Sequence, residues 1–205
     1  MRVAVSDGGS RREFVEFLHR LEWFTVVEPA GTGLVAQVKA SVRRAAEWAT
    51  PYILYTEPDK QLFFDGGLGD LIARAPSGST MGVVLAARDD RSLATFPPFQ
   101  QRTEGALNAI CADIVGPRAD YSYGPFLMNR ALVPELDAVK DDLGWGWRPF
   151  VFATARRRGY DVVHHVGDFP CPPDQRHEDE HERIHRLRQL KQNVDGLVEA
   201  IARHL

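Results

Sequence analysis

The sequence lacks several features that mark whole classes of protein. Its 205 residues include only two cysteines, Cys111 and Cys171, which are too few for a disulfide framework and favour a reducing, cytoplasmic setting. No run of about 18 apolar residues occurs, so no membrane-spanning helix is expected. The N-terminal residues turn polar at once and do not form the apolar core of a signal peptide. The formal net charge is -3, which gives no basic field to draw the chain to nucleic acid.

What is present is the composition of one globular domain with a substantial core, at 44% hydrophobic and 26% charged residues. The first half alternates β-branched, strand-like runs with stretches of helical periodicity. Expected strands lie at 3–6, 24–27, 52–56 and 81–86, and expected helices at 35–48 and 61–74. This alternation predicts βαβ units, and therefore an α/β fold with a mainly parallel sheet flanked by helices.

The second half is less regular. Helices are expected at 103–115 and 150–158, and extended segments at 121–128 and 160–166. From residue 178 onward, apolar residues recur every three or four positions, which predicts a long amphipathic C-terminal helix. We therefore divide the chain into an α/β domain at 1–177 and a C-terminal helix at 178–205. The apolar stripe of that helix either packs on the sheet or forms a homodimer seam, and its length favours the homodimer.

An acidic pair follows the apolar run at 52–56. In Glu57-Pro58-Asp59, the two acidic residues are two positions apart, so in an extended chain both carboxylates project to the same side. Such hard oxygen ligands suit Mg²⁺ or Mn²⁺, with water and a diphosphate completing the coordination. A cation there supports departure of a nucleoside diphosphate, because it neutralises charge that builds on the leaving group. The alternative interpretation is two acidic residues in a surface turn.

The order of motifs resembles that of the GT-A glycosyltransferases, especially family 2 and its relatives. Asp7-Gly8-Gly9-Ser10 follows the first strand, a glycine-bearing loop and basic helix occupy 31–44, and Tyr-Ile-Leu-Tyr-Thr-Glu-Pro-Asp occupies 52–59. Tyr123-Gly124-Pro125-Phe126 and Gly144-Trp145-Gly146 add a fainter likeness to the retaining glucosyl-3-phosphoglycerate synthases. The resemblance implies a GT-A-like domain in an enzyme that moves a sugar from a nucleotide-diphosphate donor to a sugar or small-molecule acceptor, with Mg²⁺ or Mn²⁺.

The resemblance also implies roles for individual residues. Asp7 corresponds to the nucleoside contact and Lys39 to a contact with the nucleotide. Glu57 and Asp59 correspond to the metal pair, with Glu in place of the usual first Asp. These enzymes often take a third metal ligand, commonly His, from the C-terminal third of the chain. His177 is our first candidate for that ligand, and His165 is the second.

On the acceptor side, Arg102 lies at an expected helix start and can pair bidentately with an anionic acceptor, or else with Glu104. Tyr123 can offer a flat aromatic face to a sugar or acceptor. Inverting family 2 enzymes usually carry Glu-Asp before the last helix, where this chain has Trp147-Arg148. Either Asp141 or Asp142 substitutes as the base, or the reaction retains configuration without one, so the stereochemistry stays open.

In these families the strand carrying Asp-Gly-x-Ser is normally the second, whereas here it begins at residue 3. Either the true start lies upstream, or the fold lacks the usual first strand–helix unit. Two other functions therefore stay open. One is a nucleotidyltransferase. Such an enzyme usually needs a glycine-rich loop that ends in Arg or Lys, and this loop is only loosely matched by Gly8-Gly9-Ser10-Arg11-Arg12. The other is a catalytically degenerate GT-A-like binding protein, which the missing unit and missing base both favour.

Overall fold

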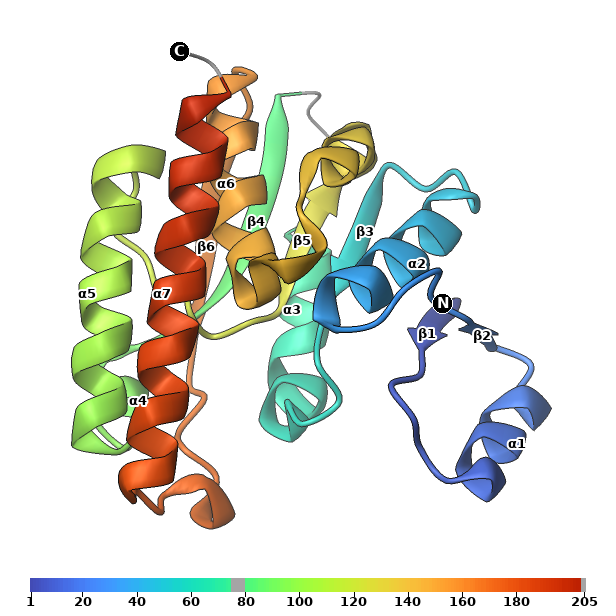
Figure 1. Ribbon diagram of the computed structural model, residues 1–205, viewed down its shortest axis with the longest axis horizontal. Helices are drawn as coiled ribbons and strands as arrows, with labels where there is room; N and C mark the ends of the chain where they lie inside the picture. Colours follow the sequence, from blue (N-terminus) through green and yellow to red (C-terminus); the bar gives the residue numbers. More distant parts are fainter. Residues whose placement is uncertain (75–79, 204–205) are drawn as a thin grey trace.

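The computed structural model describes residues 1–74 and 80–203, and strands alternate with helices through the first half of the chain (Figure 1). The strands of the described residues are β1 (Val3–Ser6), β2 (Phe24–Val27), β3 (Tyr52–Tyr55), β4 (Met81–Arg88), β5 (Phe126–Asn129) and β6 (Asp161–Gly167). The helices are α1 (Arg12–Arg20), α2 (Leu34–Ala46), α3 (Leu68–Ala73), α4 (Asp90–Leu93), α5 (Pro98–Val115), α6 (Trp147–Arg157) and α7 (Glu180–Ala202). Shorter segments are the π-helical η1 (Phe63–Gly67) and the 3₁₀ segments η2 (Arg130–Ala138), η3 (Asp141–Gly146) and η4 (Pro173–Gln175).

Most predicted elements are confirmed, and β1 and β2 have the predicted bounds. The predicted helix at 61–74 is divided into η1 and α3. Helix α5 begins at Pro98, before the predicted start at 103, because proline suits the first helical turn, where its missing N–H has no partner to lose. Of the extended segment at 121–128, only the last residues join a strand, β5.

The main sheet has four strands in the order β3-β5-β4-β6. Strand β5 runs antiparallel to both β3 and β4, whereas β4 and β6 are parallel. Three of the four strands therefore point the same way, and the α/β class with a largely parallel strand direction is confirmed. The reversed β5 was not predicted, because hydrophobic periodicity indicates the type of an element and not its direction.

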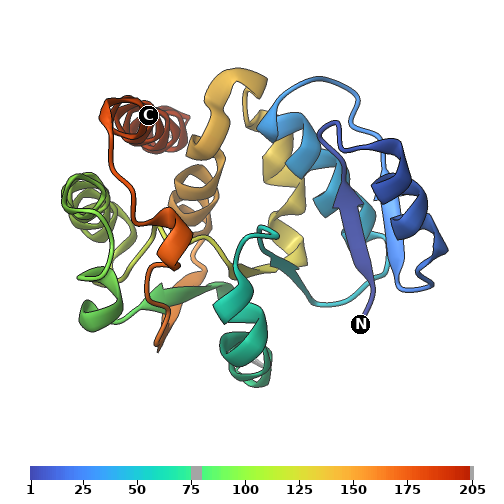
Figure 2. The same cartoon turned by 90° about the horizontal axis from the view of Figure 1, so that it is seen from below.

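A second, two-stranded sheet of β1 and β2 is parallel and separate from the main sheet. Among the described residues, β1 pairs only with β2, and β3 pairs only with β5. Strands β1 and β3 therefore each keep one unpaired edge. Helix α2 contacts both β1 and β3 and joins the two sheets. In Figure 2 the β1–α1–β2 unit lies on the opposite side of the molecule from α5 and α7.

The core lies on both faces of the main sheet. Residues Val83 and Leu85 of β4 belong to a large cluster with α2, α5, α6 and α7, which includes the fully buried Trp147 and Phe150. The alternate residues of β4 point to the other face, where a smaller cluster includes Phe63 of η1. Because β4 is buried on both sides, it reads in the sequence as a continuous apolar run.

Helix α7 is the predicted long C-terminal helix, and it packs against α5, α6 and η3 (Figure 1). The crossing is close because Gly196 on α7 meets the backbone of Gly146, and a Cβ at Gly196 would overlap the Gly146 carbonyl. This contact fixes the point at which α6 begins, and with it the direction of the first α6 side chains. None of the described helices combines the length and apolar character that a bilayer crossing requires. The proposed division of the chain at residue 177 stays a prediction.

Candidate functional site

A long open cleft of about 2290 Å³ runs from the β1–α2 side of the molecule, past the end of β3, to the polar face of α7. Its walls include β1, the segment 52–61 that holds β3 and the turn after it, the start of α6, and α7 residues such as Arg186 and Asn193. Of the residues predicted for the site, Asp7, Glu57, Asp59, Tyr123 and His177 line this cleft. The structure therefore brings five of the predicted residues to one surface.

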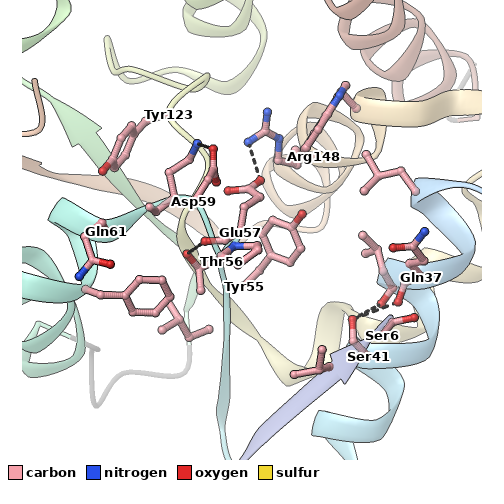
Figure 3. A pocket seen from close by; sticks show the side chains of 18 of the residues that line it. Ser6, Gln37, Ser41, Tyr55, Thr56, Glu57, Asp59, Gln61, Tyr123 and Arg148 are labelled. Carbon is pink, nitrogen blue, oxygen red and sulfur yellow. Dashed lines mark hydrogen bonds and ion pairs between the residues drawn. The ribbon is translucent and has the colours of Figure 1, made fainter. Parts of the chain in front are cut away.

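The acidic pair stands at the carboxyl end of β3, where sites in α/β sheets commonly lie. Figure 3 labels Glu57 and Asp59 among the side chains that line the cleft. The Glu57 side chain is only 13% exposed, and its Oε1 accepts a hydrogen bond of 3.3 Å from Nη1 of Arg148. Its Oε2 is buried and has no hydrogen-bond partner among the described residues. Asp59 is half-exposed and pairs with Lys60 at 3.0 Å.

Gly124 closes over the Glu57 carboxylate. Its φ of +128° is one that side-chain-bearing residues rarely adopt. A Cβ at this position would overlap Oε2 of Glu57 and lie 3.2 Å from Nη1 of Arg148. The glycine thus allows the backbone to approach the carboxylate and leaves Oε2 without a covering side chain.

Arg148 is a candidate site residue that sequence reasoning missed. It lies in the first turn of α6, lines the cleft and is 7% exposed. The Trp145 ring centroid lies 4.9 Å from its guanidinium carbon, while its Nε is buried without a hydrogen-bond partner. The sequence held a signal: by the resemblance to family 2 enzymes, an Arg stands where those enzymes usually carry an acidic residue, and this was interpreted only as the absence of a base.

Two tyrosine hydroxyls near the acidic pair stay protonated. Burial, and then the nearby Glu57 carboxylate, raise the pKa of Tyr55 far above its usual value. Burial likewise raises the pKa of Tyr123, whose ring stacks on Phe169 with centroids 4.8 Å apart. Both residues therefore present neutral phenol groups at neutral pH.

A second buried arginine, Arg88, also lines the cleft and is held by two carboxylates and a hydroxyl. It donates to Asp120 at 2.6 and 3.1 Å, to Glu104 at 2.7 Å and to Ser122 at 2.9 Å. Burial disfavours the Asp120 carboxylate, but the charge and hydrogen bonds of Arg88 outweigh it and hold the pKa of Asp120 at about 2. This network fixes the backbone between α5 and β5 that leads to Tyr123.

The β1 side of the cleft ends in a tight turn. Asp7 accepts hydrogen bonds from the N–H groups of Gly9 at 2.9 Å and Ser10 at 3.0 Å. The hydrogen bond from the Ser10 side chain, followed by that from the Gly9 backbone, lowers the pKa of the Asp7 carboxyl. Next to this turn, the buried Oγ of Ser6 has no partner among the described residues, and Gln37 and Ser41 of α2 line the same end (Figure 3).

Four predicted site residues lie away from the cleft. Lys39 donates to the Val139 carbonyl at 2.6 Å and to Asp141 at 2.8 Å, so both residues are engaged on the η2–η3 side of α2. Asp142 is exposed, and so is Arg102 on α5. None of the four is among the residues that line the cleft. Their predicted contacts with nucleotide, acceptor or reacting group rest on sequence alone.

The predicted third metal ligand does not join the acidic pair. His177 lines the cleft, but its side chain is 77% exposed and its Nε2 lies 3.4 Å from Asp179, the residue that caps α7. The second candidate, His165, lies 4.0 Å from Asp70, and burial lowers its pKa. Within residues 1–74 and 80–203, no three His, Cys, Asp or Glu side chains form a group that could hold a metal ion.

The fold is similar to that of solved structures that are distant in sequence. A mycobacterial protein matches with a TM-score of 0.64 and 16% identity, over 97% of this chain and 64% of that one. Glucosyl-3-phosphoglycerate synthase from Mycobacterium tuberculosis, in complex with Mn²⁺, UDP-glucose and phosphoglyceric acid, matches with a TM-score of 0.63 and 12% identity, over 96% and 67% of the two chains. The same synthase in complex with phosphoglyceric acid matches with a TM-score of 0.64 and 14% identity, over 97% of this chain and 68% of the synthase chain. No protein-family model and no curated protein matches the sequence.

At these identities the likeness shows the fold, and the predicted GT-A-like α/β fold is confirmed. The predicted likeness to glucosyl-3-phosphoglycerate synthases is likewise confirmed as a likeness of fold. The chain spans about two thirds of the length of these solved structures.

Proposed function

We propose that this protein transfers a sugar from a nucleoside-diphosphate donor to a small anionic acceptor, with Mn²⁺ or Mg²⁺ bound at Glu57 and Asp59. The observation that carries the proposal is the buried, unpartnered Oε2 of Glu57, beside Asp59 in the cleft of a GT-A-like fold. A buried carboxylate oxygen without a donor is costly unless a ligand satisfies it. The structurally similar synthase, which binds Mn²⁺ and UDP-glucose, supports the same conclusion.

The residues present fit a hard divalent cation in part. Pro58 and Asp59 form a turn closed by a hydrogen bond of 3.4 Å from the Lys60 N–H to the Glu57 carbonyl, rather than the extended segment that the sequence predicted. The carboxylates of Glu57 and Asp59 would supply oxygen ligands from this turn, and the donor diphosphate with water would supply the others. The bound cation would neutralise charge on the departing nucleoside diphosphate. The choice between Mn²⁺ and Mg²⁺ stays open, because both take oxygen ligands of this kind.

The cleft also offers places for the rest of the donor. We assign the nucleoside to the β1 side, where Asp7 and the unpartnered Ser6 hydroxyl lie. The diphosphate would then lie toward Glu57 and Asp59, and the sugar near the phenol face of Tyr123. The neutral Tyr55 and Tyr123 hydroxyl groups can donate hydrogen bonds without adding negative charge beside a diphosphate.

For the acceptor we propose an anion, as in the solved synthase that binds phosphoglyceric acid. On the α7 wall, His185 and Arg186 line the cleft and offer positive or proton-donating groups to such a molecule. The sequence-based role of Arg102 in acceptor binding stays a separate prediction, since that side chain is exposed on α5.

The substitution Asp59→Asn tests the metal assignment, because it removes one ligand charge with little change of volume. The matched control is Asp65→Asn, which changes an exposed acid of η1 that does not line the cleft. In calorimetric titrations with Mn²⁺ and UDP-glucose, we expect Asp59→Asn to weaken Mn²⁺-dependent donor binding at least tenfold, and Asp65→Asn to leave it unchanged. Binding of the donor by folded Asp59→Asn as tightly as by the wild type would refute the assignment.

A catalytically degenerate binding protein is the second candidate, and Arg148 favours it. This guanidinium neutralises Glu57 and stands where related enzymes carry an acid. Measurement of UDP release from UDP-glucose, with and without 3-phosphoglycerate, separates the two. Turnover supports the transferase, whereas Mn²⁺-dependent binding without turnover supports the binding protein.

A further inference from the structure

The cleft contains two buried arginines whose surroundings differ sharply. Arg88 meets two carboxylates and a hydroxyl through four side-chain hydrogen bonds of 2.6 to 3.1 Å. Arg148 is recorded with one hydrogen bond, of 3.3 Å from Nη1 to Glu57, and its Nε is buried without a partner. A guanidinium carries five N–H donors, and burying one unsatisfied costs free energy. Arg88 is thus held by two carboxylates, whereas Arg148 has one long hydrogen bond to a single carboxylate.

Arg148 and the proposed metal would share the carboxylate of Glu57. If Glu57 ligates a cation through Oε2, Arg148 loses much of the one carboxylate counter-charge that it has among the described residues. An uncompensated buried charge is strongly unfavourable, so a second anion is then required beside Arg148. Asp59 does not supply that anion, because it would bind the same cation and is already paired with Lys60.

The formal charges at this point of the cleft lead to the same conclusion. Glu57, Asp59, Lys60 and Arg148 sum to zero at neutral pH, and they all line the cleft. A bound dication would therefore leave two positive charges in excess. The diphosphate of a sugar nucleotide carries about two negative charges and would cancel them, and a phosphorylated or carboxylated acceptor would do so in part.

The position of Arg148 is rigid and suited to an anion. It is the second residue of α6, whose first turn contains no acidic side chain, and the N-terminal end of a helix favours negative charge. The close crossing of Gly196 over Gly146 fixes the backbone just before it, and Trp145 supports the guanidinium plane. The start of α6 therefore holds the Arg148 guanidinium at the wall of the cleft, beside Glu57.

From these observations we propose that Arg148 is an anion ligand released by the metal: cation binding at Glu57 frees its guanidinium to bind a phosphate or carboxylate group of donor or acceptor. The inference rests on the proposed function, because it requires the metal to bind at Glu57. Its consequence is that metal and anion bind cooperatively, each raising the affinity of the other by the same factor.

The test is a set of calorimetric titrations of Mn²⁺ alone, UDP or 3-phosphoglycerate alone, and Mn²⁺ in the presence of each anion. In the wild type we expect a saturating anion to tighten Mn²⁺ binding about tenfold. In Arg148→Met we expect Mn²⁺ alone to bind at least as tightly as in the wild type, because its competitor for Glu57 is gone, and the tightening by anion to fall at least fivefold. Arg156→Met on the same helix, exposed and paired with Asp161, is the control and should keep the wild-type coupling.

The two anions distinguish the source of the group that Arg148 binds. If coupling is lost with UDP but not with 3-phosphoglycerate, Arg148 binds the donor diphosphate. If coupling is lost with 3-phosphoglycerate but not with UDP, Arg148 binds the acceptor. Arg148→Lys covers the case in which Arg148→Met does not fold, since it keeps the charge without the planar fork and should show coupling below the wild type. Unchanged coupling for both anions in a folded variant, or weaker Mn²⁺ binding in Arg148→Met, would overturn the inference alone. Failure of the wild type to bind Mn²⁺ would overturn the proposed function as well.

Discussion

Removing the Arg88 side chain tests how the interior of the cleft is held together. In Arg88→Met, the Asp120 carboxylate, whose side chain is 5% exposed, loses its principal counter-charge, and Glu104 loses one of its partners. Breaking a buried ion pair from one side costs about 3–5 kcal/mol, because the remaining charge stays buried without compensation. The pKa of Asp120 is consistent with this size. Its displacement from 3.8 to about 2 corresponds to about 2 kcal/mol in favour of the ionised form, at 1.36 kcal/mol per pKa unit.

The expected loss has a characteristic pH dependence. In the wild type the pKa of Asp120 is depressed, so its contribution to stability is present above pH 3.8 and is lost as the pH falls towards 2. In Arg88→Met the burial of Asp120 is no longer opposed, so we expect the pKa of its carboxyl to lie above the usual value. As the pH falls from 7 towards 4, protonation of Asp120 then removes the uncompensated buried charge from the variant. The difference in unfolding free energy between the wild type and the variant therefore becomes smaller.

Urea unfolding at pH 7 and pH 4.5 measures both effects, and a thermal scan should show a midpoint lower by about 6–20 °C at pH 7, at 2–4 °C per kcal/mol for a chain of this size. The control is Arg12→Met, which removes an exposed helical ion pair with Glu16 and should cost less than about 0.5 kcal/mol. A loss below about 1 kcal/mol for Arg88→Met at pH 7, or a difference that does not narrow at pH 4.5, would refute the reasoning.

Three further substitutions have defined outcomes. Gly124→Ala should weaken Mn²⁺ binding about tenfold by calorimetry, because its Cβ would displace the Glu57 carboxylate and because residue 124 has a positive φ. Gly69→Ala, whose Cβ meets no atom within 4 Å, should leave Mn²⁺ binding unchanged. Unchanged Mn²⁺ binding by folded Gly124→Ala would contradict this prediction. Asp7→Ala should lower UDP affinity about tenfold with little change in melting temperature, since the turn it orders lies at the cleft edge; equal affinities argue against the nucleoside assignment. Leu187→Glu tests the predicted homodimer: light scattering should show a dimer for the wild type and a monomer for this variant, and a monomeric wild type removes the prediction.

The fold was largely predictable because its elements have strong local signals. Strands β1 and β2 are β-branched runs bounded by turn residues, and α7 carries an apolar residue every three or four positions. The strand direction of β5 and the gap between the sheets were not predictable, because both depend on contacts between segments far apart in the chain. The acidic pair was predicted from its residue types and spacing, and the resemblance to GT-A enzymes added the order of the other motifs.

Three of the five predicted residues that line the cleft follow a strand end. Asp7, Glu57 and Asp59 lie in the cleft because the turns after strands open onto it. Lys39 shows why helix residues are harder to place. On α2, Gln37 and Ser41 are four residues apart and line the cleft, whereas Lys39 faces η2 and η3. The sequence identifies the helix, but the face it turns to the cleft depends on how the helix packs.

The gap between the two sheets has a consequence for local unfolding. The β1–α1–β2 unit is attached to the rest of the protein chiefly through α2, and no backbone ladder joins β1 to β3. Amide hydrogens of this unit should therefore exchange with solvent through openings that leave the four-stranded sheet intact. A donor that touches both Asp7 and Glu57 would bridge the two parts. Its binding would slow exchange at β1 and β2 selectively, and part of its affinity would be spent on holding the N-terminal unit in place.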